Sequence, residues 1–466
     1  MKYISVGPDE RREMLREVGA ASIEQLFASI PSSLRFSGAL PVSPSLADPD
    51  LEDLVAGLAS QNLQCGTAPC FLGAGAYRHY RSPVVDAVLS RAEFYTSYTP
   101  YQPEISQGTL QALFEYQTLI CQLTEMEVAN ASLYDGASAL AEAVLMAQRM
   151  KHASFTGISE LVHPHHRQVV ATYAGNAGIE FRPLGRRRDG STDPGAVERS
   201  AREGAGAIVI QTPNFLGVIE PLAEIAEAAR SAGALLVVSV TEPVSLGLLQ
   251  GPGRLGADIV VGEGQSFGLP LSFGGPYLGF LACRQTAVRA LPGRLVGETK
   301  DMEGRRGYVL TLATREQHIR RERATSNICT NQGLCALVVC AQLAALGRRG
   351  ILRLARLNAW RARQTLERLE TLPQVRRALQ GAFFNEFVIE LPMEAETLCG
   401  VLAGEGILAG FPLGRVWPEM KNQLLICATE MTRPSDIEAL VTGIGRCCAR
   451  RTAPARAGAR SAHGPR

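Results

Sequence analysis

Lysine is scarce in this chain of 466 residues. Lysine and arginine together number 47, yet the lysines are only Lys2, Lys151, Lys300 and Lys421. Arginine stays protonated at neutral pH and cannot serve as an amine nucleophile. An internal Schiff base with a carbonyl cofactor could therefore form at four positions only. A preference for arginine codons accounts for the bias itself, but the chemical restriction holds whatever the cause.

The sequence also lacks the features of several broad protein classes. Its formal net charge is +2, which gives no general field for a polyanion such as nucleic acid. It has no apolar run long enough to cross a bilayer, and its first residues lack the apolar core of a secretory signal. Its 11 cysteines are scattered without a C-x-x-C pair, which fits a reducing compartment. These absences favour a cytoplasmic protein that binds neither a membrane nor nucleic acid.

The patterns that are present divide the chain into four segments. Residues 1–70 predict a helical arm, in which Asp48 is the N-cap of one helix and Pro49 its first helical residue. Residues 71–330 alternate between strand-like apolar runs and helical patterns, which predicts a large α/β domain with a mostly parallel sheet covered on both faces. Residues 331–448 predict two long helices followed by a smaller α+β unit. Residues 449–466 are basic and lack apolar periodicity, which predicts a disordered tail.

This order of helical arm, large α/β domain and small α+β domain matches the layout of fold-type I enzymes, the aminotransferase-like fold that uses pyridoxal phosphate (PLP). Other α/β architectures share the pattern. The candidate strands of the large domain are apolar runs bounded by turn residues, and they span 127–133, 157–163, 206–212, 234–240, 257–262 and 277–283.

Three turns near predicted strand ends are candidates for the cofactor region of that fold. The stretch ASLYDGASALAEA leads from a strand into a helix, where backbone N–H groups could hold a phosphate. A simple strand-to-helix turn with a capping Asp or Ser is the alternative. The residues of this turn are Asp135, Gly136 and Ser138. Glu242 stands near the place where such enzymes use an Asp to hold the pyridine nitrogen, and Gln265 or Ser266 stands where they carry the lysine. Neither side chain can form an imine, so the fold is predicted without its catalytic amine.

The stretch FYTSYTPYQPEISQG is predicted to be an extended loop, because each of its two prolines restrains the preceding residue. Tyrosine combines contact area with a hydrogen-bonding group, so the loop suits a pocket wall or a subunit contact. An ordinary ordered surface loop is the alternative. The candidate residues are Tyr95, Tyr98, Tyr101, Gln102 and Glu104.

The stretch TLATREQHIRRERATSNICTNQG carries several arginines with glutamate and glutamine between them. This pattern predicts an exposed, salt-bridged helix from Arg315 to Arg323. A charged subunit contact, or an anion site near Ser326, Asn327 and Thr330, is the functional alternative.

Two other motifs give no site. The stretch VHPHHRQVV contains three histidines, but the adjacent His165 and His166 would point about 100° apart on a helix. With no carboxylate or cysteine at ligand spacing, we expect solvated histidines at a helix start and no metal. The glycines of GEGQSFGLPLSFGG have the wrong spacing for a dinucleotide-binding turn, so no NAD site is expected.

Four stretches resemble the P-protein of the glycine cleavage system, glycine dehydrogenase (decarboxylating). They are FLGAGAYRHYRSPVVDAVLSRAEFYTSYTPYQPEISQG, ANASLYDGASALAEA, GADIVVGEGQSFGLPLSFGGPYLGFLA and ATREQHIRRERATSNICTNQG. The likeness runs from near residue 2 to about 445. In its length, and in lacking the lysine that forms the Schiff base, this chain resembles the alpha chain of the two-chain form. Arg78 and Arg81 depart from the resemblance, which predicts less basic residues there.

The resemblance implies a reaction and partners. Glycine would be decarboxylated by PLP held on a lysine of subunit 2, and the aminomethyl group would pass to the lipoyl arm of H-protein. This chain would bind no cofactor covalently, would be inactive alone, and would complete the active site at the interface of a heterotetramer. The tyrosine-rich loop would be its contribution to the partner's pocket. A self-sufficient PLP enzyme with an unexpected lysine, or a structural or regulatory scaffold, are the alternatives.

Overall fold

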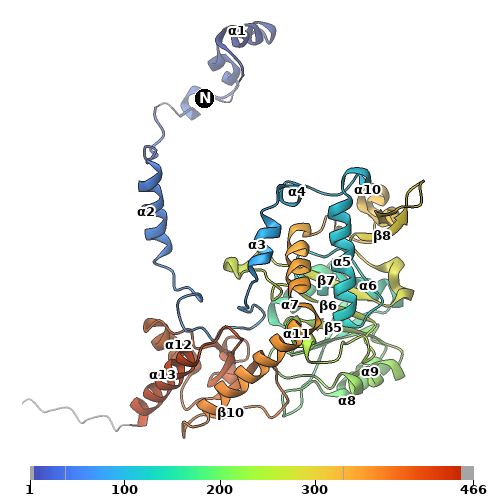
Figure 1. Ribbon diagram of the computed structural model, residues 1–466, viewed down its shortest axis with the longest axis vertical. Coiled ribbons are helices and arrows are strands. Elements are labelled where there is room, and N and C mark those ends of the chain that lie inside the picture. Colours follow the sequence, from blue (N-terminus) through green and yellow to red (C-terminus); the bar gives the residue numbers. More distant parts are fainter. Residues whose placement is uncertain (1–4, 37, 329, 453–466) are drawn as a thin grey trace, which may run out of the picture. The chain divides into compact units, whose positions relative to one another are not determined.

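The computed structural model describes residues 5–36, 38–328 and 330–452, and it forms two compact units, Met1–Asn62 and Leu63–Arg466 (Figure 1). The first unit contains the helices α1 (Pro8–Glu17) and α2 (Asp48–Ala59). Helix α2 is present as the sequence predicts, but it begins at Asp48, so that Ala47 and not Asp48 is its N-cap, and proline stands in its first turn. Within this unit neither helix buries a side chain.

The second unit is built around a seven-stranded sheet in the order β1-β7-β6-β5-β4-β2-β3. Strands β2 to β6 run parallel to one another, and β7 is antiparallel to both β6 and β1. The mostly parallel sheet predicted from the sequence is therefore confirmed. The strands are β1 (Val128–Ala129), β2 (Phe155–Ser159), β3 (Glu180–Leu184), β4 (Ala207–Gln211), β5 (Leu235–Val240), β6 (Ile259–Glu263) and β7 (Gly279–Cys283).

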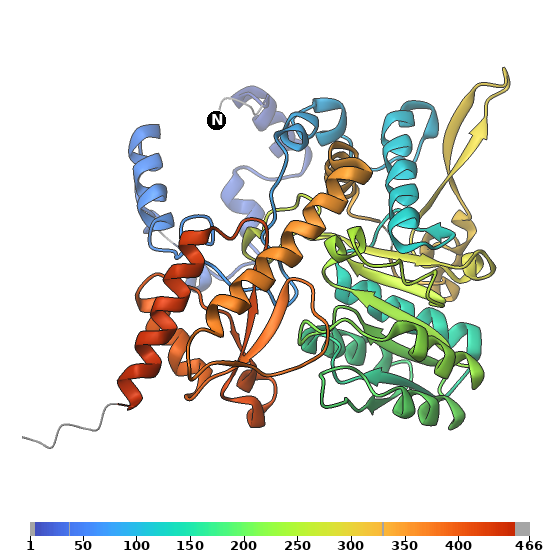
Figure 2. The same cartoon turned by 60° about the horizontal axis from the view of Figure 1, so that its bottom comes forward.

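Both faces of this sheet are covered, which explains why its central strands β4 and β6 are buried at every position and mostly apolar. Alternate residues of β4 enter different cores: Ile208 and Ile210 belong to one, Ala207 and Val209 to the other. Helices α5, α9 and α11 contribute to the first core, and α6 and α7 contribute to the second (Figure 2). The helices from α3 to α9 are α3 (Pro83–Leu89), α4 (Ala92–Tyr95), α5 (Gln107–Thr124), α6 (Gly136–Lys151), α7 (Pro164–Gly175), α8 (Pro194–Arg202) and α9 (Leu222–Ser231).

A smaller antiparallel sheet in the order β10-β11-β13-β12 forms a second layer with its own core. Its strands are β10 (Arg376–Arg377), β11 (Glu386–Glu390), β12 (Phe411–Pro412) and β13 (Gln423–Cys427). Its helices are α12 (Ala395–Gly404) and α13 (Pro434–Thr452). The part of the expected disordered tail from 453 to 466 lies outside the described residues.

Helix α11 (Gly333–Leu369) joins the two layers and bends at Gly347, whose φ is +56°. Val338 and Leu343 pack in the core of the large sheet, whereas Leu366 packs in the core of the small sheet. By length and composition α11 could cross a membrane, and it is the one helix among the described residues that could. Its buried side chains belong to the two cores.

Three expectations differ from the structure. The hairpin β8 (Leu295–Lys300) and β9 (Arg306–Thr311) was not predicted, because its polar sequence has no apolar alternation; it projects from the second unit (Figure 2). Strand β3 was missed for the same reason. The predicted continuous helix from Arg315 to Arg323 is wrong. Only α10 (Gln317–Arg320) is α-helical, with short 3₁₀ turns at Ala313–Arg315 and Arg321–Arg323, and the Arg315 guanidinium donates to the carbonyl groups of Leu291 and Gly293.

Candidate functional site

The carboxyl ends of the parallel strands carry buried polar residues, which is where open α/β sheets bind ligands. Gln211 ends β4, Glu242 follows β5, and Glu263 ends β6. All three side chains are buried. The structure brings the start of α6 to the same edge, because the N–H of Gly136 lies 2.9 Å from Oε2 of Glu263. The predicted cofactor residues before α6, after β5 and after β6 are therefore neighbours in space.

The turn before α6 is a capping box. Asp135 accepts a 2.7 Å hydrogen bond from the N–H of Ser138, and Ser138 Oγ accepts one from the N–H of Asp135. The next amide, Gly136 N–H, donates to Glu263. Glu263 also accepts hydrogen bonds from the N–H groups of Leu278 and Gln265, and its burial raises its pKa to about 7. The amides that could hold a phosphate therefore already have acceptors within the chain.

Glu242 is bound by an imidazole of the same chain. His79 Nε2 lies 2.8 Å from Glu242 Oε2, and His79 Nδ1 lies 2.9 Å from Glu430 Oε2. Asn385 donates a further hydrogen bond to Glu242. Burial lowers the pKa of His79, but the charges of Glu242 and Glu430 outweigh burial and raise this pKa to about 10. A buried imidazolium N–H thus faces the carboxylate that was predicted to hold a pyridine nitrogen.

The side-chain amide of Gln265 forms hydrogen bonds with both the N–H and the carbonyl group of Tyr77. Its Oε1 accepts from the N–H of Tyr77 at 2.9 Å, and its Nε2 donates to the carbonyl of Tyr77 at 2.9 Å. Nε2 also donates to the carbonyl of Leu269. The hydroxyl of Ser266 is buried and has no hydrogen-bond partner in the described part of the chain. The side-chain amide at the predicted lysine position is therefore fully engaged in hydrogen bonds within the chain.

Residues 73–80, named here the plug segment, connect these contacts. The carbonyl of Ala74 lies 2.8 Å from His163 Nε2, and the Tyr77 hydroxyl donates to Glu386 at 2.8 Å. The N–H of Tyr80 donates to Glu430, next to the small sheet. Burial raises the pKa of Glu386 to about 7. The plug segment ties the strand ends of the large sheet to the small domain.

Two histidines of the VHPHHRQVV stretch, His163 and His166, differ from the expectation of solvated side chains, whereas His165 is exposed at the start of α7 as expected. His163 caps α7, is buried, and packs edge-on against Phe215 with ring centroids 4.9 Å apart. Burial lowers the pKa of His163 to about 4 and that of His166 to about 3, so both are neutral at pH 7. Among the residues that the structure describes, no group of three or more His, Cys, Asp or Glu side chains could hold a metal ion.

The residues at these strand ends do not fit PLP. The lysine position holds an amide, His79 bonds the carboxylate expected at the pyridine nitrogen, and Glu263 bonds the amide of Gly136. A Cβ at Gly136 would lie 3.1 Å from Cβ of Glu263, so the approach is tight. Three lysines lie within the described ranges, and all are exposed: Lys151, Lys300 and Lys421. Lys151 ends α6, the helix end opposite to the capped turn.

The predicted tyrosine-rich loop lies elsewhere: it runs from the last residues of α4, which include Tyr95, to the start of α5. Tyr98 is 89% exposed, and Tyr95 and Tyr101 are also largely exposed. Gln102 and Glu104 stand at the 3₁₀ turn Pro103–Ile105. Exposed aromatic side chains in one loop are typical of a contact surface.

A cavity of about 240 Å³ links this loop to the segment before α11. It is lined by Tyr95, Tyr98 and Thr99 on one side, and by Thr330 and Asn331 on the other. The structure therefore brings Thr330 to the tyrosine-rich loop. Of the other predicted residues, Tyr101, Gln102, Glu104, Ser326 and Asn327 do not line the cavity.

Arg294, which the sequence did not single out, lies under the tyrosine-rich loop. Its guanidinium donates to the hydroxyl of Thr99 and lies 5.1 Å from the ring centroid of Tyr101. The residue is 2% exposed, and its Nε and Nη2 have no hydrogen-bond partner among the described residues. A single arginine in a turn gives no periodic signal, so only the fold shows this contact.

Comparisons with known proteins agree over almost the whole chain. Residues 1–444 match the glycine cleavage system P-protein family. The chain is 48% identical over 445 residues to a probable glycine dehydrogenase (decarboxylating) subunit 1 of Desulfitobacterium hafniense, covering 96% of this chain and 99% of that one. It is also 48% identical over 448 residues to a protein of the same description in Rhodospirillum centenum, with coverages of 95% and 99%.

The fold is also similar to solved structures. A crystal structure of glycine decarboxylase (P-protein) of the glycine cleavage system, in inhibitor-bound form, matches with a TM-score of 0.83 and 44% identity. That match covers 96% of this chain and 100% of the other. A cysteine desulfurase of Thermococcus onnurineus matches at 18% identity with a TM-score of 0.60, a likeness of fold alone.

Proposed function

Because the chain belongs to the glycine cleavage system P-protein family and has the fold-type I architecture, we propose that it is the cofactor-free subunit of a two-chain glycine decarboxylase. Its partner, subunit 2, holds PLP, which when bound supplies an electron sink for the loss of CO2 from glycine. The aminomethyl group passes to the lipoyl arm of H-protein. Two copies of each subunit form the assembly.

The filled strand ends are the observation that carries this proposal. In this chain the plug segment and Glu263 already engage the groups predicted for a cofactor, and no amine stands at the predicted lysine position. Its part in the reaction is then to shape the partner's pocket. The exposed tyrosine-rich loop and the cavity that it forms with Thr330 and Asn331 provide the surface for this role.

Arg294 is a positioning residue for that surface. Its contacts with Thr99 and Tyr101 fix the loop from below, while Nε and Nη2 keep unused donors. A buried charge without an anionic partner is costly in an isolated chain. Arg294 acts from within this chain, because it holds the tyrosine-rich loop in the conformation that meets subunit 2.

The first unit supports a heteromeric assembly as well. The apolar residues of α2 are about half exposed, among them Leu54 at 51% and Leu58 at 57%. Apolar residues on one exposed helix are typical of a surface that another chain covers. We assign subunit 2 as that chain.

The first prediction concerns cofactor attachment. We expect no stoichiometric adduct at a single lysine after the full-length chain is mixed with PLP and reduced with borohydride, and none at position 265 after the same treatment of Gln265→Lys. The new amine would lack a site, because His79 and Glu263 still engage the groups that the ring and phosphate need. Mass spectrometry of tryptic peptides reads the result, with subunit 2 as the positive control. A stoichiometric adduct on any lysine of the wild-type chain would favour a self-sufficient PLP enzyme instead.

The second prediction concerns the tyrosine-rich loop. Tyr98→Ala should lower glycine decarboxylation by the reconstituted subunits by about tenfold, because misplacing groups near a reaction by ~1 Å can cost up to a hundredfold. Its thermal unfolding should be unchanged, since Tyr98 is 89% exposed. Phe273→Ala, at a residue 96% exposed and outside the loop, is the matched control and should keep full turnover. Equal turnover in both variants would favour the scaffold role.

A further inference from the structure

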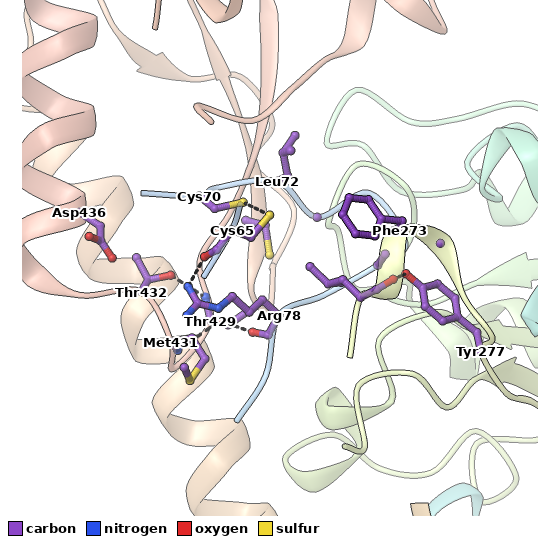
Figure 3. A pocket seen from close by; sticks show the side chains of 15 residues that line it. Cys65, Cys70, Leu72, Arg78, Phe273, Tyr277, Thr429, Met431, Thr432 and Asp436 are labelled. Atoms are coloured by element: carbon purple, nitrogen blue, oxygen red, sulfur yellow. Dashed lines mark hydrogen bonds between the residues drawn. The ribbon is translucent and has the colours of Figure 1, made fainter. Parts of the chain in front are cut away.

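Two cysteines lie next to each other in the lining of a second cavity, of about 260 Å³, beside the plug segment (Figure 3). Cys65 and Cys70 are both partly exposed, and the thiol of Cys70 donates a hydrogen bond to the sulfur of Cys65 at 3.3 Å. Both line the cavity, through which a small oxidant can reach them. Their separation exceeds a disulfide bond length of about 2.05 Å by little more than 1 Å.

Arg78 of the plug segment lies over this pair. Its guanidinium donates to the carbonyl of Cys65, as Figure 3 shows. The hydrogen bond from Cys70 lowers the pKa of Cys65 to about 6; burial opposes this shift and the Arg78 charge adds to it. Cys70, which donates that hydrogen bond, has its pKa raised by the same contact and by burial. Cys65, which accepts the hydrogen bond and faces the Arg78 charge, therefore has the features of an attacking cysteine, and Cys70, which donates the hydrogen bond, has those of a resolving cysteine.

We propose that Cys65 and Cys70 are a reversible oxidation site for hydroperoxides, with hydrogen peroxide as the simplest substrate. The Cys65 thiolate attacks one peroxide oxygen, the O–O bond breaks, and the departing hydroxide takes a proton to leave as water. Cys65 is then a sulfenic acid. The sulfur of Cys70 attacks it, the S–O bond breaks as the S–S bond forms, and the proton of Cys70 leaves with the hydroxide as a second water. Two thiols are oxidised and one peroxide is reduced to two waters.

The local fold permits this closure. Between the two cysteines stand Gly66, Thr67, Ala68 and Pro69, so the new ring is short and contains one glycine. The N–H of Phe71 bonds the carbonyl of Leu408, which fixes the chain directly after Cys70. When the disulfide bond forms, the turn that carries Cys65 therefore moves toward Cys70. Oxidation also removes the negative charge of the Cys65 sulfur, which faces Arg78. Because Arg78 belongs to the plug segment, oxidation weakens an electrostatic contact of that segment.

The test uses the full-length reduced chain and hydrogen peroxide. After alkylation of the remaining thiols, trypsin releases the peptide 36–78, which contains Cys65 and Cys70 and no other cysteine. We expect this peptide to lose the mass of two hydrogens and both alkyl labels, and dithiothreitol to restore them. The peptide 92–149 contains Cys121 alone, whose pKa burial raises to about 11, and should stay fully labelled.

Two variants assign the order of the steps. Cys70→Ser should stop at the sulfenic acid, so that dimedone labels Cys65. Cys65→Ser should leave Cys70 reduced and open to alkylation. Thermal unfolding by circular dichroism checks that each variant folds, and the wild-type peptide result needs neither variant. Oxidation of Cys121 as fast as Cys65, or a peptide 36–78 that keeps both labels at peroxide levels that oxidise Cys121, would overturn the proposal.

Discussion

His79→Ala should lower the free energy of unfolding of this chain by about 3–5 kcal/mol, the range for removing one partner of a buried ion pair. The side chains of His79 and Glu242 are 2% and 1% exposed, so the variant leaves two carboxylates, Glu242 and Glu430, without their cation. Chemical denaturation followed by circular dichroism measures the loss. His318→Ala is the matched control, because that histidine is 58% exposed beside Glu316 and its loss should change little.

The pH dependence identifies the charge of His79 as the cause. Its folded pKa of about 10 lies above the ordinary value of 6.5, so the stabilisation is complete below pH 6.5 and is lost as pH rises toward 10. Glu263 and Glu386 have folded pKa values of about 7 against an ordinary 4.5, so their contribution to the free energy of unfolding is lost at lower pH, as pH rises from 4.5 to 7. His79→Ala should therefore abolish only the alkaline slope of the wild-type curve. Parallel curves above pH 7 would contradict a charged imidazole at this position.

The sequence was sufficient for the fold because its signals are local. Strand–helix alternation and apolar strands predict a parallel sheet, and the turn at Gly136 and the residues Glu242 and Gln265 stand directly next to predicted elements. These residues meet at one edge because parallel strands end at the same side. The resemblance to a family then supplied the reaction.

The plug segment could not be predicted in the same way. His79 and Glu242 are 163 residues apart, and Gly136 and Glu263 are 127 residues apart, so no window of sequence contains either contact. The basic residues Arg78 and Arg81 stood out as departures from the family resemblance, but the histidine between them makes the buried contact. Burial is likewise invisible in the sequence, which is why His163 was expected to be solvated.

A substitution of Arg294 is expected to lower the turnover of the enzyme without lowering the stability of this chain. Arg294→Met should leave the melting temperature of the isolated chain unchanged or raise it, because replacing a buried, unpaired charge by an apolar side chain of similar length is often neutral or stabilising. The same variant should lower the turnover of the reconstituted enzyme at least about tenfold, or about 1.4 kcal/mol in transition-state stabilisation. The reason is that Thr99 and Tyr101 lose the group that fixes their loop.

The control for this experiment is Arg361→Met. Arg361 also stacks on an aromatic ring, with its guanidinium 4.7 Å from the centroid of Trp360, and its Nε also lacks a partner in the described part of the chain. It lies on α11, away from the tyrosine-rich loop, so turnover should be kept. Steady-state kinetics at varied glycine and varied subunit 2 then distinguish a loop that is misplaced from an assembly that is weakened. If the melting temperature of Arg294→Met falls together with its turnover, Arg294 has a purely structural role. If the melting temperature is kept while the turnover falls, Arg294 positions the tyrosine-rich loop.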